Sequence, residues 1–198
     1  MKTAGLILAG GASSRMGAPK ALLRIGGETF LTRLIHIFSA YCDSVCVVLG
    51  HDADVIRAGT PVDLNVHYVV NEHYQLGQLS SLQCGLRAVQ NESDAVLFCP
   101  VDVPGFKTST AASLVQRFRP DQDFIVAPRY QGRHGHPVLI HSALISEFLA
   151  LDASAQARDV VHRHVGRTQY VDVEDAGTLK DIDDREAYLS LLSPTEGA

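Results

Sequence analysis

The stretch LILAGGASSRMGAPKALL, residues 6–23, decides the fold of this chain. It opens with an apolar run and passes into a loop that holds Gly10, Gly11 and Gly17 together with Arg15 and Lys20. A short apolar run bounded by glycine is typical of a buried strand that ends in a tight turn. Glycines permit positive φ and leave the backbone bare, so main-chain N–H groups can converge on an anion. The stretch therefore predicts a first strand with an anion-binding turn at its carboxyl end.

The rest of the chain repeats this pattern of strand and helix. The expected buried strands, rich in Val, Ile and Leu, are Thr3–Ala9, Ser44–Leu49, Val66–Val70, Ala95–Cys99 and Phe124–Ala127. Apolar residues recur at helical spacing in two intervening segments, Phe30, Leu31, Leu34, Ile35 and Phe38, and then Leu79, Leu82, Leu86 and Val89. Alternating strands and helices predict an α/β fold, a three-layer sandwich whose mostly parallel sheet is covered on both faces.

The second half of the chain is less regular. In RYQGRHGHPVLI, after Pro128, Gly132 and Gly135 separate two short extended pieces, which predicts a hairpin-like insertion. The expected elements beyond it are a helix from about Ser142 to Leu149, a strand at Gln169–Val173 and a terminal helix from about Asp184 to Leu192.

Length and charge narrow the class of protein. A chain of 198 residues with 46% hydrophobic residues fits one domain, since domains usually run to roughly 100–200 residues. We expect residues 1–192 to form it and residues 193–198 to be a disordered tail. The 17 basic and 22 acidic side chains give a net charge of −5, without the basic excess that binding a nucleic acid requires. No nucleic-acid partner is expected.

The cysteines and the lengths of the apolar segments indicate the cellular compartment in which the protein is expected. The four cysteines form no C-x-x-C pair, and Cys46, Cys84 and Cys99 lie in apolar surroundings, which favours buried reduced thiols over disulfides or zinc ligands. The first apolar run is too short for a secretory signal, and no segment approaches the length of a membrane span. We therefore expect a cytoplasmic protein that contacts no membrane.

The glycine loop fits neither of two familiar phosphate-binding motifs. A P-loop has four residues between its glycines and then Lys-Ser/Thr, whereas five residues separate Gly11 from Gly17 and Ala21 follows Lys20. The dinucleotide fingerprint G-x-G-x-x-G fails because Gly10 and Gly11 are adjacent. The loop is thus predicted to hold phosphate in another way, the alternative being an ordinary turn between a strand and a helix.

Acidic residues provide candidates for a metal site. In DAVLFCPVDVPGF, Asp102 follows an apolar strand at the expected rim of the glycine loop, and Mg²⁺ prefers one or two carboxylates together with substrate phosphates. A local turn cap is the alternative for Asp102. In LKDIDDREAY, Asp181 and Asp183 would point to one side of an extended segment, while Asp183 or Asp184 could instead cap the last helix.

Two polar segments remain. In LGQLSSLQCGL, Gly77, Ser80 and Ser81 precede a helix whose free N–H groups suit an anion or a base edge, with simple capping by Ser80 as the alternative. In RHGHPV, His134 and His136 could share a strand face, but no third ligand lies nearby, which favours substrate contact or a solvent-facing pair over a metal.

Together these segments resemble a known family. LAGGASSRMGAPK resembles the signature L-A-x-G-x-S-x-R-M-G-x-x-K of nucleotidyltransferases with a Rossmann-like fold, particularly those that attach a nucleotide to molybdopterin. The resemblance covers nearly the whole chain, because the second loop, PVDVP, GRHGHPVLI and LKDIDDREAY look like further motifs of that family. The last motif departs from the family's D-I-D-T-P-E-D at Asp184-Arg185 and Ala187.

The resemblance implies a role for each matching residue. By this resemblance the catalytic residues are Arg15, Lys20 and Asp102, and the Mg²⁺ ligands are Asp102 and Asp183. Nucleotide contacts come from Leu8, Ala9, Gly10, Gly11, Arg15, Lys20, Gly77, Ser80 and Ser81. Gly135 and His136 face the acceptor.

The resemblance also implies a reaction. An acceptor phosphate oxygen attacks the α-phosphorus of a nucleoside triphosphate and pyrophosphate leaves, with no protein nucleophile. LAGG is usual in guanylyl-transferring members, but the serine pair and the G-H-P segment look like cytidylyl-transferring ones, so CTP is favoured and GTP is second. A molybdoenzyme that receives the cofactor is a possible protein partner. The alternatives are transfer to a sugar phosphate or methylerythritol phosphate, or a non-catalytic nucleotide- or cofactor-binding module.

Overall fold

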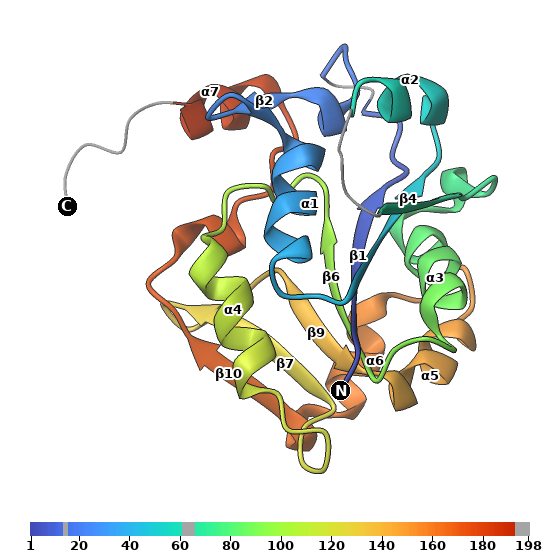
Figure 1. Ribbon diagram of the computed structural model, residues 1–198, viewed down its shortest axis with the longest axis vertical. Coiled ribbons are helices and arrows are strands. Elements are labelled where there is room, and N and C mark those ends of the chain that lie inside the picture. The colour runs from blue at the N-terminus through green and yellow to red at the C-terminus, as the bar shows by residue number, and fades with distance from the viewer. Residues whose placement is uncertain (14–15, 61–65, 193–198) are drawn as a thin grey trace.

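The computed structural model describes residues 1–13, 16–60 and 66–192, which form a three-layer α/β sandwich (Figure 1). The central sheet has eight strands in the order β10-β7-β9-β6-β1-β4-β5, with β8 paired to β7. Its strands are β1 Thr3–Ala9, β4 Ser44–Leu49, β5 Val66–Val70, β6 Ala95–Pro100, β7 Ile125–Tyr130, β8 Arg133–His134, β9 Val138–His141 and β10 Thr168–Asp172. A small two-stranded ribbon, β2 Arg24–Ile25 with β3 Glu28–Thr29, lies apart. Arg15 and the predicted tail lie outside the described residues.

Strand β1 lies in the interior of the sheet, which explains its unbroken apolar sequence. It pairs in parallel with β4 on one side and with β6 on the other, so that Leu6 is level with Cys46 and with Phe98. All seven residues of β1 are buried. A parallel strand covered on both faces reads as a continuous apolar run, and the prediction of such a strand is confirmed.

Helices cover both faces of the sheet, as predicted. Alternate residues of β1 point to opposite faces: Ile7 lies in one core and Leu6 in the other. The first core packs against α1 Phe30–Ser39, α2 Ala53–Ala58, α4 Thr108–Arg117 and α7 Arg185–Leu192. The second packs against α3 Gln78–Val89, α5 Ile145–Leu149 and α6 Ala157–Arg163. The apolar faces predicted for α1 and α3 are buried in these two cores.

The second half of the sheet departs from a purely parallel arrangement. Strand β9 runs antiparallel between β6 and β7, and β8 pairs antiparallel with β7, which confirms the predicted hairpin. The helix predicted from Ser142 begins as a 3₁₀ turn, Ser142–Leu144, and continues as α5. The strand predicted at Gln169–Val173 starts one residue earlier, as β10.

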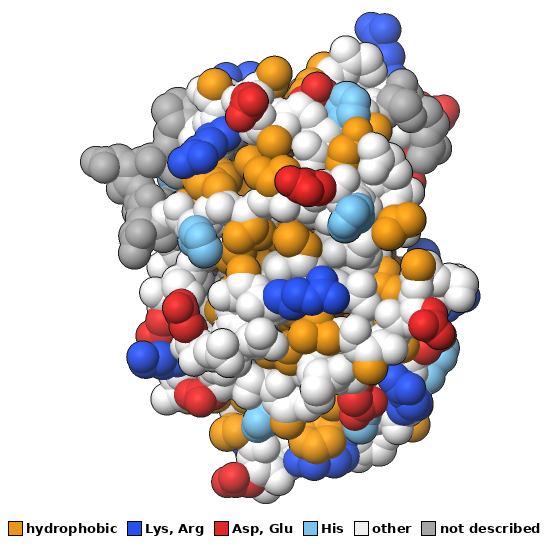
Figure 2. Space-filling view, turned by 90° about the vertical axis from the view of Figure 1, so that its right-hand side faces the viewer, with side chains coloured by type: hydrophobic (Ala, Val, Ile, Leu, Met, Phe, Trp, Pro, Cys, Tyr) orange, Lys and Arg blue, Asp and Glu red, His pale blue; other side chains and the backbone are white. Residues whose placement is uncertain are grey.

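The surface and the thiols refine two further expectations. Basic and acidic side chains are interspersed with apolar patches on the face that carries α3 (Figure 2). Cys46 and Cys99 are buried free thiols as expected, whereas Cys84 is a free thiol of intermediate exposure because its helix α3 turns it toward the sheet's edge strand, where its Sγ contacts the Val70 carbonyl oxygen. Within the described residues, no helix is long and apolar enough to cross a bilayer.

Candidate active site

Two neighbouring parallel strands carry the first elements of the site at their carboxyl ends. Leu8 of β1 is level with Pro100 of β6, and the Val101 N–H donates to the Leu8 carbonyl oxygen at 2.9 Å. The glycine turn therefore begins beside the segment that leads to Asp102. Ligands of open α/β sheets bind outside the carboxyl ends of the strands, and the predicted shared rim is confirmed.

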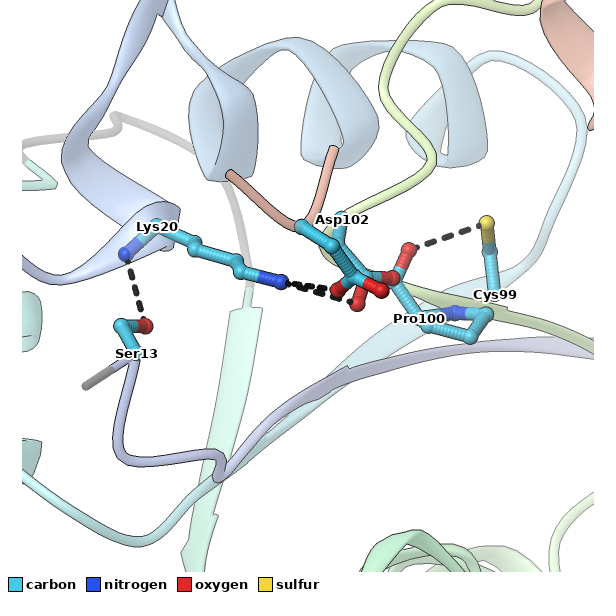
Figure 3. A network of polar contacts seen from close by, with 6 residues as sticks. Ser13, Lys20, Cys99, Pro100 and Asp102 are labelled. Atoms are coloured by element: carbon cyan, nitrogen blue, oxygen red, sulfur yellow. Dashed lines mark hydrogen bonds and ion pairs between the residues drawn. The ribbon is translucent and has the colours of Figure 1, made fainter. Parts of the chain in front are cut away.

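Lys20 joins two carboxylates that are far apart in the sequence. Its ammonium Nζ lies 2.6 Å from Asp183 Oδ1 and 3.5 Å from Asp102 Oδ2. Figure 3 shows the side chain reaching from the loop across to Asp102, while the Lys20 backbone N–H donates to Ser13 Oγ at 3.0 Å. Because the Lys20 side chain is only 13% exposed, its charge depends on these carboxylates for compensation.

Neighbouring residues of the acidic cluster before α7 have different contacts: Asp183 faces the site and Asp184 caps the helix. The Ile182 N–H donates to the Asp102 carbonyl oxygen at 2.7 Å, and Ile182 itself is buried, which holds Asp183 against the rim of the sheet. Asp184 Oδ1 accepts from the Ala187 N–H at 2.8 Å and so caps the helix. The capping and the site-facing alternatives for this cluster therefore both occur, on adjacent residues.

Burial and like charges govern the titration of the carboxylates. Burial raises the pKa of Asp102, the nearby Lys20 ammonium opposes the rise, and Asp181 and Asp183 add to it. The pKa of Asp181 is also raised, first by burial and then by Asp183. A cation placed among these groups would relieve the repulsion between them.

The glycine turn is set by close packing at Gly10. A Cβ atom at Gly10 would lie 2.9 Å from Ser81 Oγ, so a larger residue would displace the Ser81 hydroxyl from its present position. Of the three predicted glycines only Gly17 has a positive φ, +68°, and Gly10 is needed instead for this close approach. The turn and the start of α3 thereby form one wall of the site.

Asn71 organises that wall. Its amide nitrogen donates to Ser80 Oγ at 2.9 Å and to Ser81 Oγ at 3.1 Å, while its carbonyl oxygen accepts from the His73 N–H at 3.0 Å. The side chain is buried, with every polar atom satisfied. Ser81 Oγ thus accepts from Asn71, so the hydroxyl hydrogen of Ser81 is not used in that bond.

Ser80 does not cap the helix, contrary to the alternative considered for it. Helix α3 begins at Gln78 with Gly77 at the cap position, one turn before Ser80. The carbonyl oxygens of His73 and Gly77 lie 3.0 and 2.8 Å from Ser80 Oγ and share its single hydroxyl hydrogen. Ser80 therefore supports the loop before α3 and lies outside the lining of the cavity described next.

These elements enclose a small polar cavity of about 240 Å³, which we call the phosphate pocket. It brings together nine of the predicted site residues: Leu8, Ala9, Gly10, Gly11, Lys20, Gly77, Ser81, Asp102 and Asp183. The rest of the lining is Ser13, Ala21, Ile56, Tyr74, Gln78, Pro100 and Val101.

A second, larger cavity of about 510 Å³ adjoins the first, and we call it the apolar pocket. It shares four lining residues with the phosphate pocket: Leu8, Gly77, Gln78 and Pro100. Its remaining lining is Leu76, Leu79, Leu82, Phe98, His136, Val138, Ala153, Ala155, Gln156, Ala157, Arg158 and Val161. Arg158 is the single Lys or Arg among these described lining residues.

His136 lies in the apolar pocket as a neutral ring. Its pKa is lowered to about 4, because burial disfavours the charged form more than the Asp102 charge favours it. The buried Nδ1 atom has no hydrogen-bond partner among the described residues, and the ring packs edge-on against Phe98. His136 therefore lines the apolar pocket as an uncharged ring with one nitrogen that no described residue satisfies.

The other residues of that segment have structural surroundings. Gly135 lines neither pocket, and its missing Cβ lets the loop pack against the Thr178 carbonyl oxygen. His134 stacks on Tyr170 of β10 with ring centroids 3.8 Å apart, rather than sharing a site with His136. Among the described residues, no group of three or more His, Cys, Asp and Glu side chains could hold a metal ion. A metal bound between Asp102 and Asp183 would need further ligands from substrate or water.

Several residues that line or support the two pockets are not indicated by the sequence motifs. Asn71 follows β5 directly, so a polar residue at the carboxyl end of an apolar run was an available signal. Tyr74 and Gln78 lie in or beside the short 3₁₀ turn Tyr74–Leu76, whose path the sequence does not indicate. Arg158 carries no signal of its own, because it reaches the site only through the position of α6.

A mostly parallel sheet with a glycine turn, a lysine and two carboxylates at its carboxyl edge defines an α/β protein of the nucleotidyltransferase type. The solved structure of Rv0371c from Mycobacterium tuberculosis H37Rv has the same fold, with a TM-score of 0.83 and 24% identity over 97% of this chain and 98% of that one. A second structure of that protein is a complex with manganese, with a TM-score of 0.80.

The chain belongs to the MobA-like NTP transferase domain family, which matches residues 5–168. Over 124 residues it is 34% identical to a probable molybdenum cofactor guanylyltransferase of Rhodopirellula baltica, a match that covers 62% of this chain and 58% of that protein. It is 24% identical to the molybdenum cofactor cytidylyltransferase of Escherichia coli (strain K12), over 93% of each chain. The predicted family is confirmed, and relatives of both nucleotide types are found.

Proposed function

We propose that the chain transfers a nucleoside monophosphate from a nucleoside triphosphate to molybdopterin and releases pyrophosphate. CTP is the favoured nucleotide, GTP is the second candidate, and Mg²⁺ is the metal. The observation that carries the proposal is the joining of Lys20, Asp102 and Asp183 at the glycine turn. Pure binding of a nucleotide does not require two carboxylates at the phosphates, which favours catalysis over a binding module.

The transfer itself demands little covalent chemistry from the protein. A phosphate oxygen of the acceptor forms a bond to the α-phosphorus, and the bond from that phosphorus to the departing pyrophosphate breaks. Because the acceptor phosphate is already ionised, neither a protein nucleophile nor a dedicated base is needed. The Lys20 ammonium offsets the charge that develops on the phosphoryl oxygens, and the rest is positioning. Arg15 is proposed to contact the same phosphates.

Asp102 and Asp183 fit a divalent cation. They present carboxylate oxygens to one point, where a cation, the Lys20 ammonium, already contacts both of them. Mg²⁺ is typically held by one or two carboxylates and completes its shell with phosphates and water. When bound, it would offset negative charge on the triphosphate.

The apolar pocket supports an acceptor that carries a fused ring system. Its lining is mostly aliphatic and aromatic, with His136 and Arg158 among its few polar groups. Such pockets bury ring systems and orient them through a small number of polar contacts, whereas a sugar or polyol would leave its hydroxyls unpaired. A pterin fits this chemistry better than a sugar phosphate or methylerythritol phosphate does.

The wall between Gly10 and Ser81 supports the smaller base. The two residues approach so closely that a Cβ at Gly10 would lie 2.9 Å from Ser81 Oγ, within a pocket of about 240 Å³. Ser81 also offers a hydrogen to an acceptor atom of the ligand. A pyrimidine, which has a smaller ring system than a purine and acceptor atoms at its edge, suits this wall.

Pyrophosphate release tests the proposal. The chain is incubated with CTP, GTP, ATP or UTP and Mg²⁺, together with molybdopterin, 2C-methylerythritol 4-phosphate or a hexose phosphate, and pyrophosphate and the dinucleotide product are measured. We expect release with molybdopterin, fastest with CTP. Thermal stabilisation by a nucleotide with no release for any acceptor would instead identify a binding module. Location in the cytoplasm, the absence of nucleic acid and membrane partners, and a molybdoenzyme as recipient stay predictions.

A further inference from the structure

Lys20 contacts the same two carboxylates that are proposed to bind Mg²⁺, and this overlap has a consequence for how the metal enters. We infer that Lys20 is the internal counter-ion of Asp102 and Asp183, and that Mg²⁺ binds only when a triphosphate draws the ammonium away from them. The metal and the nucleotide would then bind together, and neither carboxylate would be left unpaired in between. This inference rests on the proposed function.

The ammonium is placed as a counter-ion would be. Its Nζ lies 2.6 Å from Asp183 Oδ1, a strong charge-assisted hydrogen bond, and 3.5 Å from Asp102 Oδ2. Its side chain is largely shielded from water. A divalent ion between the same oxygens would lie within a few ångströms of a positive charge, where repulsion is strong because water screens it poorly.

The side chain can move without moving the backbone. The Lys20 N–H is fixed to Ser13 Oγ, and its carbonyl oxygen accepts from the Leu23 N–H at 3.0 Å in the 3₁₀ turn Lys20–Leu22. Only the flexible stem must swing for the ammonium to leave the carboxylates. The phosphate pocket, which Lys20 lines, provides the place to which a triphosphate would draw it.

Pairing with Lys20 also explains how the protein tolerates this cluster without a metal. Asp102 and Asp183 each lie within 3.5 Å of the same ammonium, and two carboxylates placed so close together repel each other when no cation lies between them. The ammonium stabilises them in the absence of metal. It thereby weakens the affinity of the empty pocket for Mg²⁺.

Metal binding without nucleotide tests the inference. Mn²⁺ affinity is measured by electron paramagnetic resonance on the full chain and on Lys20→Gln, Lys20→Arg and Lys107→Gln. We expect Lys20→Gln to bind Mn²⁺ about tenfold more tightly or better than wild type, because an opposing charge is gone. Lys20→Arg keeps the charge and should stay weak. Lys107→Gln removes the same charge at an exposed lysine that contacts the Glu174 carbonyl oxygen, and should match wild type.

Circular dichroism shows whether the Lys20→Gln chain folds. If it does not, a second measurement on the wild-type chain tests the inference. Inorganic tripolyphosphate added to the wild-type chain should tighten Mn²⁺ binding beyond what the anion alone achieves in free solution. Equal or weaker Mn²⁺ affinity of a folded Lys20→Gln chain overturns the inference, as does the lack of any tripolyphosphate effect on the wild type. Neither measurement involves nucleotide transfer. A failure of the proposed function would therefore be seen in a different assay, in which the wild-type protein would release no pyrophosphate.

Discussion

The phosphate pocket and the apolar pocket adjoin at one edge of the sheet, but they are formed by different structural elements and different types of side chain. The phosphate pocket is formed by loops that leave β1 and β6, and it holds a cation and two carboxylates within hydrogen-bonding reach. The apolar pocket is formed by α3, α6, β9 and side chains of the sheet, and its polar groups are few. One is suited to the nucleoside triphosphate, and the other to the acceptor.

The contrast teaches how the two halves of a transfer reaction can be varied independently. Charge neutralisation needs a few groups at fixed points, which strand ends supply. Recognition of an acceptor needs shape, which packed helices supply. If this division holds, damage to the phosphate pocket should affect every substrate pair, whereas damage to the apolar pocket should affect the acceptor alone.

The largest expected effect follows from Asp102→Asn in the phosphate pocket. Loss of the carboxylate weakens metal binding at the reacting phosphates, and we expect turnover to fall by about a hundredfold to a thousandfold. This loss of turnover is measured as the rate of pyrophosphate release at saturating acceptor with saturating CTP, and separately with saturating GTP. Folding should be little affected, because Asp102 is an acid whose burial already disfavours its charge.

Two adjacent acids provide the control for this prediction. Asp183→Asn should reproduce the loss of turnover, while Asp184→Ala removes the cap of α7 and should cost about 1 kcal/mol of stability without affecting metal binding. Full pyrophosphate release by Asp102→Asn would remove that residue from the mechanism.

The two pockets also differ in how far the sequence predicts them. The phosphate pocket depends on strand ends, and a glycine turn after Ala9 or an acid after β6 is visible as a local pattern. The apolar pocket depends on where α3 and α6 pack, which is decided by tertiary contacts. Arg158 lies in the first turn of a seven-residue helix whose packing position local spacing does not reveal, and Asn71 acts through two serines that follow it nine and ten residues later. The place of β9 between β6 and β7 was likewise hidden, because strand order is a property of the assembled sheet.

In the apolar pocket, Arg158→Met should raise the KM for the acceptor about tenfold and leave the KM for the nucleotide unchanged. A hydrogen bond from a charged group to an acceptor phosphate or ring contributes roughly 1.5–3 kcal/mol, and methionine keeps much of the apolar stem. Initial rates with each substrate varied in turn separate the two constants. A parallel rise in the nucleotide KM would show that the pockets do not divide the substrates as argued. Arg163→Met, on the same helix but outside both pockets, is the matched control.

Asn71→Asp should change nucleotide preference more than overall rate. The amide donates to both serines, whereas a carboxylate can only accept, so Ser81 would turn its hydrogen away from the pocket and present lone pairs instead. We expect the ratio of kcat/KM for CTP to that for GTP to fall by about fivefold, which corresponds to the free energy of one hydrogen bond, about 1 kcal/mol. Asn71→Ala, which removes the polar partner without reversing it, should weaken binding of both nucleotides. An unchanged ratio in Asn71→Asp would place base recognition elsewhere.

The smallest effect concerns His136 and the pH dependence of stability. Its pKa in the folded chain is about 4, below the value near 6.5 of an unfolded histidine, so the unfolded state takes up the proton first as the pH falls. Stability from this residue is therefore present above about pH 6.5 and is lost progressively toward pH 4. Between about pH 7.5 and pH 5.5 the wild type should lose about 1 kcal/mol more than His136→Gln, measured by urea unfolding at both values. His162→Gln, which replaces an exposed histidine, is the matched control and should follow the wild type. Equal losses in wild type and His136→Gln would mean that the pKa of the ring in the folded chain lies near the unfolded value of about 6.5. The apolar pocket would then hold a second cation beside Arg158 at pH 5.5.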